Sequence, residues 1–185
     1  MTSDRQDGDG GLADVQAVHD ELEAARAAFH RLVEGATQAD LCRASAGTRW
    51  TNDQLLFHML FGYLIARALL VVARLFARLP AGASRGFAWL LDAAAGPFDV
   101  VNYYGSCAGV RFCGRRRMVA TFDRVIASLH RQLAAETEAG LRRGMYYPLR
   151  WDPFFKDFMT LADIYHYPTQ HFSFHQQQLT LDDVS

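Results

Sequence analysis

The sequence predicts an all-α protein, a four-helix bundle with short extra helices in a central insertion. Long stretches carry apolar residues at steps of three and four, and no stretch alternates apolar and polar residues between turn signals. The chain has 185 residues, 50% of them hydrophobic, which is enough for the core of one domain. We therefore expect a single helical-bundle domain over residues 12–181, preceded by a disordered leader at residues 1–11.

The first long helix is predicted over residues 12–34. Val15, Val18 and Leu22 recur at intervals of three and four, which places them on one face of a helix. A polar connector over residues 35–50 follows. Thr51 and Gln54 then fit the capping box of a helix start, so the second helix is expected to begin at Thr51 and to run to about residue 79.

The second helix contains an apolar run over residues 55–79, long enough to raise the question of a membrane span. Arg67, Arg74 and Arg78 interrupt the run and, at about 100° per residue, lie within roughly 40° of one another on one face. Such a stripe is costly in an isolated membrane helix, so we expect a soluble protein with no membrane partner. His58 lies on the opposite side of the helix, where it should face the bundle core.

The central part of the chain is harder to assign. Residues 80–84 break the second helix, and residues 85–95 predict a short helix that ends at a Gly-Pro pair. We expect residues 98–114, which are apolar and contain several glycines, to be irregular. The third long helix is expected over residues 115–139, where apolar residues return to helical spacing and Gly140 follows.

The last helix is predicted to begin at Thr160, which can act as its cap, and to run to about residue 179. Pro168 lies inside this range, so a kink or a restart is expected there. Before this helix, Asp152 followed by Pro153 suits the start of a short turn over residues 154–158. No strand is expected anywhere in the chain.

The charge and the cysteine content exclude several classes of protein. Lys and Arg number 19 against 20 Asp and Glu, which gives a net charge of −1 and favours no nucleic-acid partner. Three cysteines without a C-x-x-C spacing argue against a disulfide framework or a structural zinc knuckle, and a reducing cytoplasm fits best. Cys107 and Cys113 are expected to be small buried hydrophobic residues.

Three of the seven histidines form a candidate metal site. His171 and His175 are four residues apart on the last helix, so their side chains lie on one face. With the inward-facing His58 they would present three imidazoles from two helices, a set that suits zinc, nickel or ferrous iron and leaves coordination positions open. The alternative is that they are core histidines hydrogen-bonded to glutamine or backbone. Phe172 stands where the H-E-x-x-H motif needs glutamate, so peptide hydrolysis is not expected.

The other histidines are weaker candidates. His166 lies about 140° around the helix from His171, and Pro168 separates them, so it is expected in the pocket wall at most. The remaining three are expected at the surface or at its boundary: His19, His30 and His130.

Two motifs carry a resemblance to a known family. Residues 48–58 read TRWTNDQLLFH, and residues 167–179 read YPTQHFSFHQQQL. In this order and separation they resemble the two signatures of the DinB-like (YfiT-like) metalloprotein superfamily, over about residues 14–181. The resemblance implies a four-helix bundle in up-down-down-up order, a homodimer, and a divalent metal ion held by His58, His171 and His175.

The resemblance also implies a range of activities. Members of this superfamily include transferases that join bacillithiol or mycothiol to electrophiles, and a mycothiol-dependent maleylpyruvate isomerase. We therefore expect a metal-dependent enzyme that acts on a small molecule, most plausibly a mycothiol-type S-transferase. The alternatives are a non-catalytic, stress-induced metal-binding protein and a metal-dependent hydrolase. The apolar segment over residues 80–114 exceeds what a minimal member needs, which leaves the substrate and the catalytic residues open.

Three further sets of residues are candidates for supporting roles. Glutamines beside the histidine pair are expected to orient the ligands: Gln170, Gln176 and Gln177. Residues 115–117 are three arginines at a helix start, where they either hold an anionic group or form a solvated face. Side chains of the central segment are candidates for the pocket lining: Asn102, Tyr103 and Tyr104.

Overall fold

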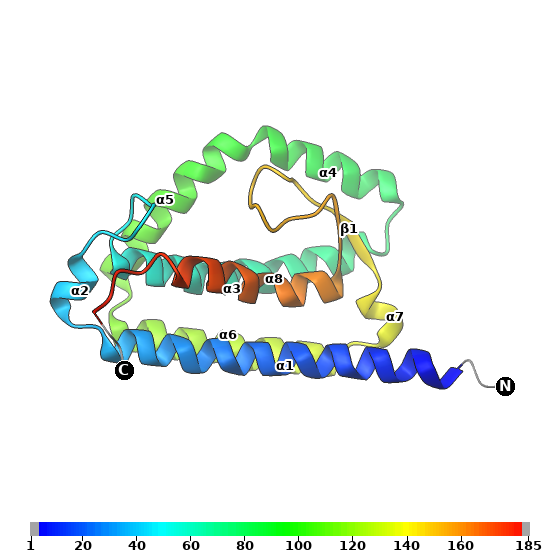
Figure 1. The fold of residues 1–185 in the computed structure, drawn as a ribbon. Helices are drawn as coiled ribbons and strands as arrows, with labels where there is room; N and C mark the ends of the chain where they lie inside the picture. The colour runs from blue at the N-terminus through cyan, green and yellow to red at the C-terminus, as the bar shows by residue number, and fades with distance from the viewer. Residues whose placement is uncertain (1–3, 183–185) are drawn as a thin grey trace.

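The computed structural model describes residues 4–182, with side chains from residue 14 onwards. Four long helices form the bundle (Figure 1), as predicted: α1 (Asp4–Gly35), α3 (Asn52–Phe76), α6 (Arg115–Ala134) and α8 (Leu161–Gln176). Four further helices join them among the described residues: α2 (Gln38–Cys42), α4 (Ala81–Ala93), α5 (Ala95–Phe112) and α7 (Glu138–Leu141). The protein is therefore all-α in its main architecture.

Contacts between the helix ends give the helix directions. His19 stacks on His130 toward one end of the α1 and α6 pair, and Arg115 donates to the Ala36 carbonyl at the other end, so these helices are antiparallel. Asn52 at the start of α3 accepts a hydrogen bond from the Thr180 amide just beyond α8, at 3.1 Å, so α3 and α8 are also antiparallel. Figure 1 shows α1 and α8 running one way and α3 and α6 the other.

One aromatic residue from each long helix meets at the centre of the bundle. Phe29 of α1 stacks on Phe122 of α6 with ring centroids 4.2 Å apart, and Tyr63 of α3 meets the same Phe122 ring edge-on at 4.8 Å. Phe172 of α8 completes the group. All four side chains are fully buried, and burying a side chain of this size contributes about 1.5–3 kcal/mol of stability.

The capping residues begin the helices where the sequence predicts. Thr51 accepts from the Gln54 amide and Thr160 from the Asp163 amide, and in both boxes the second side chain returns a bond to the cap backbone. The predicted starts of α3 and α8 are confirmed. Both helices end about three residues earlier than expected, and α8 continues through Pro168 without a break.

The first helix starts earlier than the sequence predicts. It begins at Asp4 and so includes most of the segment that we expected to be a disordered leader. No proline interrupts this part of the sequence, although Gly8, Gly10 and Gly11 lower its helix propensity, which is why the sequence favours a later start. Residues 1–3 of the expected leader lie outside the described residues.

The prediction of an irregular segment over residues 98–114 is wrong. These residues belong almost entirely to α5, and the preceding helix α4 covers Ala81–Ala93 rather than residues 85–95. The glycines that suggested a loop include one that permits close packing. A Cβ atom on Gly109 would lie 2.1 Å from the ring of Phe57, so only glycine lets α5 approach α3 at this point.

The prediction that no strand occurs is also wrong. β1 (Gly144–Tyr146) and β2 (Phe158–Thr160) form an antiparallel pair that closes the base of a loop over residues 147–157. Strands of three residues are too short to show an alternating pattern in the sequence. The loop lies inside the arch that α4 and α5 make above the bundle (Figure 1).

The connection before β1 also differs from the expectation. The helix predicted over residues 115–139 ends at Ala134, and α7 follows as a separate helix. Thr137 begins α7 by accepting a hydrogen bond from the Gly140 amide. Residues 153–154 form the turn expected near Asp152, and the chain then continues into β2.

By length and composition, α3 is the one helix of the described residues that could cross a membrane, with a mean hydropathy of 2.1. In the structure, however, 50% of its most apolar window is buried inside the protein. Arg67 and Arg78 are exposed, and Arg74 forms a hydrogen bond of 2.7 Å with Glu136 after α6. A core helix of a soluble protein has the same composition, so α3 alone is no signature of a membrane protein.

Candidate metal centre

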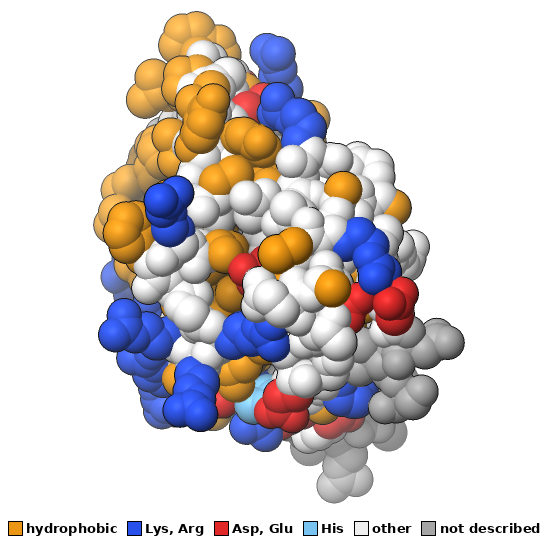
Figure 2. Space-filling model, turned by 90° about the vertical axis from the view of Figure 1, so that its left-hand side faces the viewer, with side chains coloured by type: hydrophobic (Ala, Val, Ile, Leu, Met, Phe, Trp, Pro, Cys, Tyr) orange, Lys and Arg blue, Asp and Glu red, His pale blue; other side chains and the backbone are white. Residues whose placement is uncertain are grey.

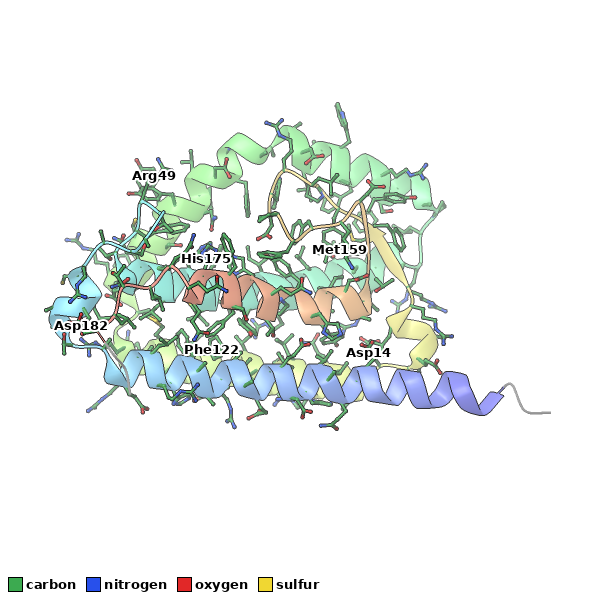
Figure 3. The ribbon with its side chains drawn as sticks, viewed as in Figure 1. Asp14, Arg49, Phe122, Met159, His175 and Asp182 are labelled. Carbon is green, nitrogen blue, oxygen red and sulfur yellow. The ribbon has the colours of Figure 1, made fainter. Side chains whose placement is uncertain are left out.

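The three histidines predicted as ligands lie together between α3 and α8. One ligand nitrogen from each of His58, His171 and His175 lies within 4.8 Å of the others. The Nε2 atoms of His58 and His175 are 3.2 Å apart. Figure 3 shows His175 on α8 where this helix packs against α3.

All three imidazoles are held in the neutral form. His58 and His171 are buried, with 5% and 4% of their surfaces exposed, and His175 is half-buried. Burial and then the neighbouring His175 lower the pKa of His58 to about 3. Burial also lowers the pKa of His171 well below its usual value and, to a smaller extent, the pKa of His175. Neutral imidazole is the form that binds a metal ion.

Two of the imidazoles lack the hydrogen bonds expected of core histidines. The Nδ1 atoms of His58 and His171 are buried and have no partner among the described residues. The alternative of a satisfied core histidine therefore fails at these two positions. Nδ1 of His171 packs directly against Gly62 of α3.

The third imidazole is oriented by a glutamine. Nδ1 of His175 is 2.7 Å from Oε1 of Gln178. Because this oxygen accepts, Nδ1 carries the proton and Nε2 keeps the lone pair that a metal ion needs. The Gln178 carbonyl accepts from the Ala46 amide at 2.8 Å, which ties the end of the chain to the loop before α3.

The glutamines expected in this orienting role do not fill it. Their side chains are exposed: Gln170, Gln176 and Gln177. Gln178 follows the last turn of α8, three residues after His175.

Trp50 packs on the first histidine. Its ring stacks on His58 with centroids 4.4 Å apart and an angle of 26° between the planes. Tyr103 of α5 stacks behind it at 6.2 Å. These contacts restrict rotation of the His58 ring, a role that the sequence indicates only through the presence of tryptophan before the capped helix.

A cavity of about 200 Å³ opens beside the histidines, between α3, α5, α8 and the loop over residues 147–157. Of the three candidates from the central segment, Asn102 lines the cavity, Tyr103 covers Trp50, and Tyr104 is exposed. The cavity is the place where a small molecule could meet the imidazole nitrogens.

One acidic residue of this cavity, Asp152, is not predicted as a site residue from the sequence. Asp152 was considered only as a cap, a role that it does fill through a hydrogen bond of 2.9 Å from the Phe154 amide. Its Oδ2 also accepts from the Tyr167 hydroxyl at 2.9 Å and lies 3.8 Å from Nε2 of His171. Burial raises the pKa of this carboxyl group. In the sequence, the only indication that Asp152 lies in a cavity is that it is an acidic residue among apolar neighbours.

The remaining histidines lie away from the cluster, at the helix surfaces. His166 faces α1, where it contacts Asp14 and Glu21 at 3.1 and 2.9 Å, so it is not part of the cavity wall. The others lie along α1 and α6, partly exposed as predicted: His19, His30 and His130.

The arginine and cysteine candidates have structural positions. Arg115 donates to the Ala36 carbonyl and to Gln38 at 3.1 Å each, which joins α6 to the end of α1, while Arg116 and Arg117 are exposed. The cysteines are free, and Cys107 and Cys113 are half-buried rather than buried as expected.

A helical bundle in which neutral imidazoles from two helices converge beside a cavity defines a protein with a candidate mononuclear metal centre. The sequence comparison gives the family. The family model of the DinB superfamily matches residues 21–179, a range that contains His58, His171 and His175, and the chain belongs to this superfamily. No curated protein and no solved structure matches the chain significantly.

Proposed function

We propose that this protein is a metal-dependent enzyme that joins a low-molecular-weight thiol of the mycothiol type to a small electrophile. His58, His171 and His175 are the proposed ligands, and zinc, nickel and ferrous iron are the candidate ions. The observation that carries the proposal is the convergence of three neutral imidazoles beside a cavity large enough for a small molecule.

The spacing of the imidazoles supports a shared ion. Two nitrogens that each lie about 2.0–2.1 Å from a tetrahedral ion are about 3.3 Å apart. The Nε2 atoms of His58 and His175 are 3.2 Å apart, close to this value. Three protein ligands leave a position open for thiol, water or substrate, as in catalytic rather than structural sites.

A divalent cation held by His58, His171 and His175 would lower the pKa of a bound thiol and so would supply a thiolate at neutral pH. Asp152 lines the same cavity, and its Oδ2 receives the thiol proton while the Tyr167 hydroxyl holds the carboxylate in place. The sulfur forms a bond to the electrophilic carbon, and the leaving group departs with the bonding electrons. Aromatic walls exclude water that would compete with the thiol.

The first test measures metal content. The wild-type chain and the variants His58→Ala, His171→Ala and His175→Ala are each loaded with zinc, nickel or ferrous iron and analysed by elemental analysis. His130→Ala, which changes a histidine outside the cluster, serves as the control. We expect each cluster variant to lose stoichiometric metal and the control to keep it. If all three cluster variants keep full occupancy, the proposal is wrong.

The second test measures thiol transfer. A panel of thiols that includes mycothiol is combined with electrophiles, and thiol consumption is followed with the metal-loaded and the metal-free protein. Turnover that depends on the metal supports the proposal. If no thiol is consumed but metal binds, the protein is a non-catalytic metal-binding member of its family.

Metal-dependent hydrolysis is a second candidate function. The position of Asp152 favours it, because a carboxylate beside the open side of the centre can take a proton from water as well as from a thiol. Hydrolysis of ester or amide substrates without any thiol present distinguishes this activity from thiol transfer.

We also propose a cytoplasmic homodimer whose partners are small molecules rather than nucleic acids. Large apolar side chains are exposed on three helices: Val71, Leu75, Trp89, Leu90, Val101 and Phe112. Figure 2 shows hydrophobic side chains gathered in the upper left of the view, at the height of α4 and α5. Contiguous apolar surface of this kind favours association. Light scattering tests the dimer, and a monomer at all accessible concentrations would contradict it.

A further inference from the structure

The cavity beside the histidines has aromatic walls. An aromatic ring comes from each element that borders it: Phe61 of α3, Phe98 of α5, Trp151 of the loop over residues 147–157, and Tyr167 and Phe174 of α8. Apolar rings of this kind stack on, or meet edge-on, a planar ring placed between them. The wall therefore favours a flat apolar ligand over a flexible polar one.

The outer wall is held in place by the central insertion. The ring of Phe98 stacks on that of Trp151 with centroids 3.8 Å apart and an angle of 17°. Nε1 of Trp151 donates to the Leu91 carbonyl of α4 at 2.8 Å. The insertion that exceeds a minimal bundle thus builds one side of the cavity. Because one face of the tryptophan ring and its polar edge are constrained, this side of the cavity is held in place, and its shape restricts what can enter.

The described side chains that line the cavity include an acidic group but no lysine or arginine. Among the described residues that line the cavity, Asp152 is the only acidic one and none is lysine or arginine. The other polar side chains of the lining are uncharged or are imidazoles: Asn102, Tyr167, Trp50, Trp151 and the three histidines. A carboxylate brought into the aromatic part of the cavity would lose its hydration, find no cation in the wall, and face the Asp152 carboxyl group. Uncharged ligands avoid all three costs.

The size of the cavity fits a ligand of one ring. A dry apolar cavity of about 150 Å³ is large enough to bind benzene. The cavity here measures about 200 Å³, which is room for one ring with small substituents.

We propose that this cavity binds an uncharged, single-ring aromatic group. The inference rests on the proposed function in one respect, namely that the cavity holds the electrophile. On that basis the electrophile is a neutral aryl or benzyl compound, and the carbon attacked by the thiol lies at the end of the ring nearest to His171 and His175.

The test compares two ligands of similar shape that differ in charge. Benzamide is neutral, and benzoate is negatively charged. Each is titrated by calorimetry into the full chain after removal of metal by chelation, so that benzoate cannot bind through a cation. We expect benzamide to bind at least about tenfold more tightly than benzoate. Equal affinity, or tighter binding of benzoate, would overturn the proposal.

Variants show whether binding occurs in this cavity. Asp152→Asn keeps the shape of the side chain and removes its charge, so benzoate affinity should rise by about tenfold while benzamide affinity stays the same. Phe98→Ala should weaken benzamide binding by about tenfold, because it removes one wall. Tyr104→Ala, on the same helix but with 64% of its surface exposed, should have no effect. The proposal fails if Tyr104→Ala and Phe98→Ala weaken binding equally.

These outcomes are independent of the metal. If the chain binds no metal but shows the expected preference for benzamide, the proposed thiol transfer fails and the cavity assignment stands. If the metal-loaded chain transfers thiols but the metal-free chain shows no preference for benzamide, only the ligand class is wrong.

Discussion

Gly62 lies directly against the imidazole of His171. A Cβ atom on Gly62 would be 2.7 Å from Nδ1 of His171 and 3.0 Å from its Cε1. Both distances are too short for an unstrained contact, so any side chain at this position displaces the ring or separates α3 from α8. Glycine is costly inside a helix, and the close approach to His171 accounts for its presence here.

We therefore expect Gly62→Ala to weaken metal binding. Displacement of one ligand should reduce zinc affinity by about tenfold or more, within the range seen when the residues that hold metal ligands are changed. Competition with a chromophoric chelator measures this affinity. Gly105→Ala in α5 is the matched control, because a Cβ atom there meets nothing within 4 Å. A Gly62→Ala protein with the zinc affinity of the wild type would show that His171 is not a ligand.

The contact between Gln178 and His175 predicts a second effect on the same centre. Gln178→Leu removes the acceptor that fixes the proton on Nδ1 of His175, so the Nε2 lone pair is no longer held toward the centre. We expect zinc affinity to fall by about tenfold. Gln177→Leu, one residue earlier and exposed, should leave it unchanged. Gln178→Glu keeps an acceptor oxygen and should restore most of the affinity; failure of this rescue would contradict the orienting role.

The parts of this protein that were predictable depend on residues close together in the sequence. The caps at Thr51 and Thr160 each involve a partner three residues away, and His171 and His175 share a face because they are one turn apart. His58 was predicted to face inward because the arginines of the same helix mark its solvent side. Local spacing therefore sufficed for the starts of α3 and α8 and for the inward direction of the three histidines.

The parts that were missed depend on contacts between distant segments. In the sequence Gly109 indicates a loop, whereas in the structure it allows its helix to pack closely against Phe57 of another helix. In the sequence Asp152 indicates only a helix cap, whereas the fold places it beside Tyr167 and His171. Gln178 acts on His175 only because the end of the chain is tied to Ala46. No pattern within a single helix carries this information.

His166 predicts a pH-dependent contribution to stability. Burial alone would lower its pKa, but hydrogen bonds and charge interactions with Glu21 and Asp14 outweigh it, and the pKa is raised. A raised pKa in the folded state means that the stabilisation is complete below the unfolded value of about 6.5 and is lost as the pH rises through the folded value.

Urea unfolding at pH 6 and at pH 9 measures this contribution. The wild type should exceed His166→Gln in unfolding free energy by about 1 kcal/mol at pH 6, the size of a partly exposed ion pair, and the difference should shrink at pH 9. Glu21→Gln should reduce the same pH dependence, because it removes one of the two acidic partners. Parallel curves for the wild type and His166→Gln across this range would contradict the assignment.

Asp152 allows a test of how the thiol proton is handled. Asp152→Asn keeps an oxygen that can accept from the Phe154 amide, so the loop should keep its turn, but the side chain can no longer take a proton. If Asp152 accepts the thiol proton, kcat for thiol transfer should fall by about 100-fold, a typical loss for a general base. Zinc content should stay at the wild-type level, because the metal is assigned to the three histidines. Asp157→Asn is the control, since Asp157 is an exposed acidic residue of the same loop and should keep full activity. A loss of zinc in Asp152→Asn would instead make Asp152 a ligand, and unchanged kcat with unchanged zinc would remove it from the mechanism.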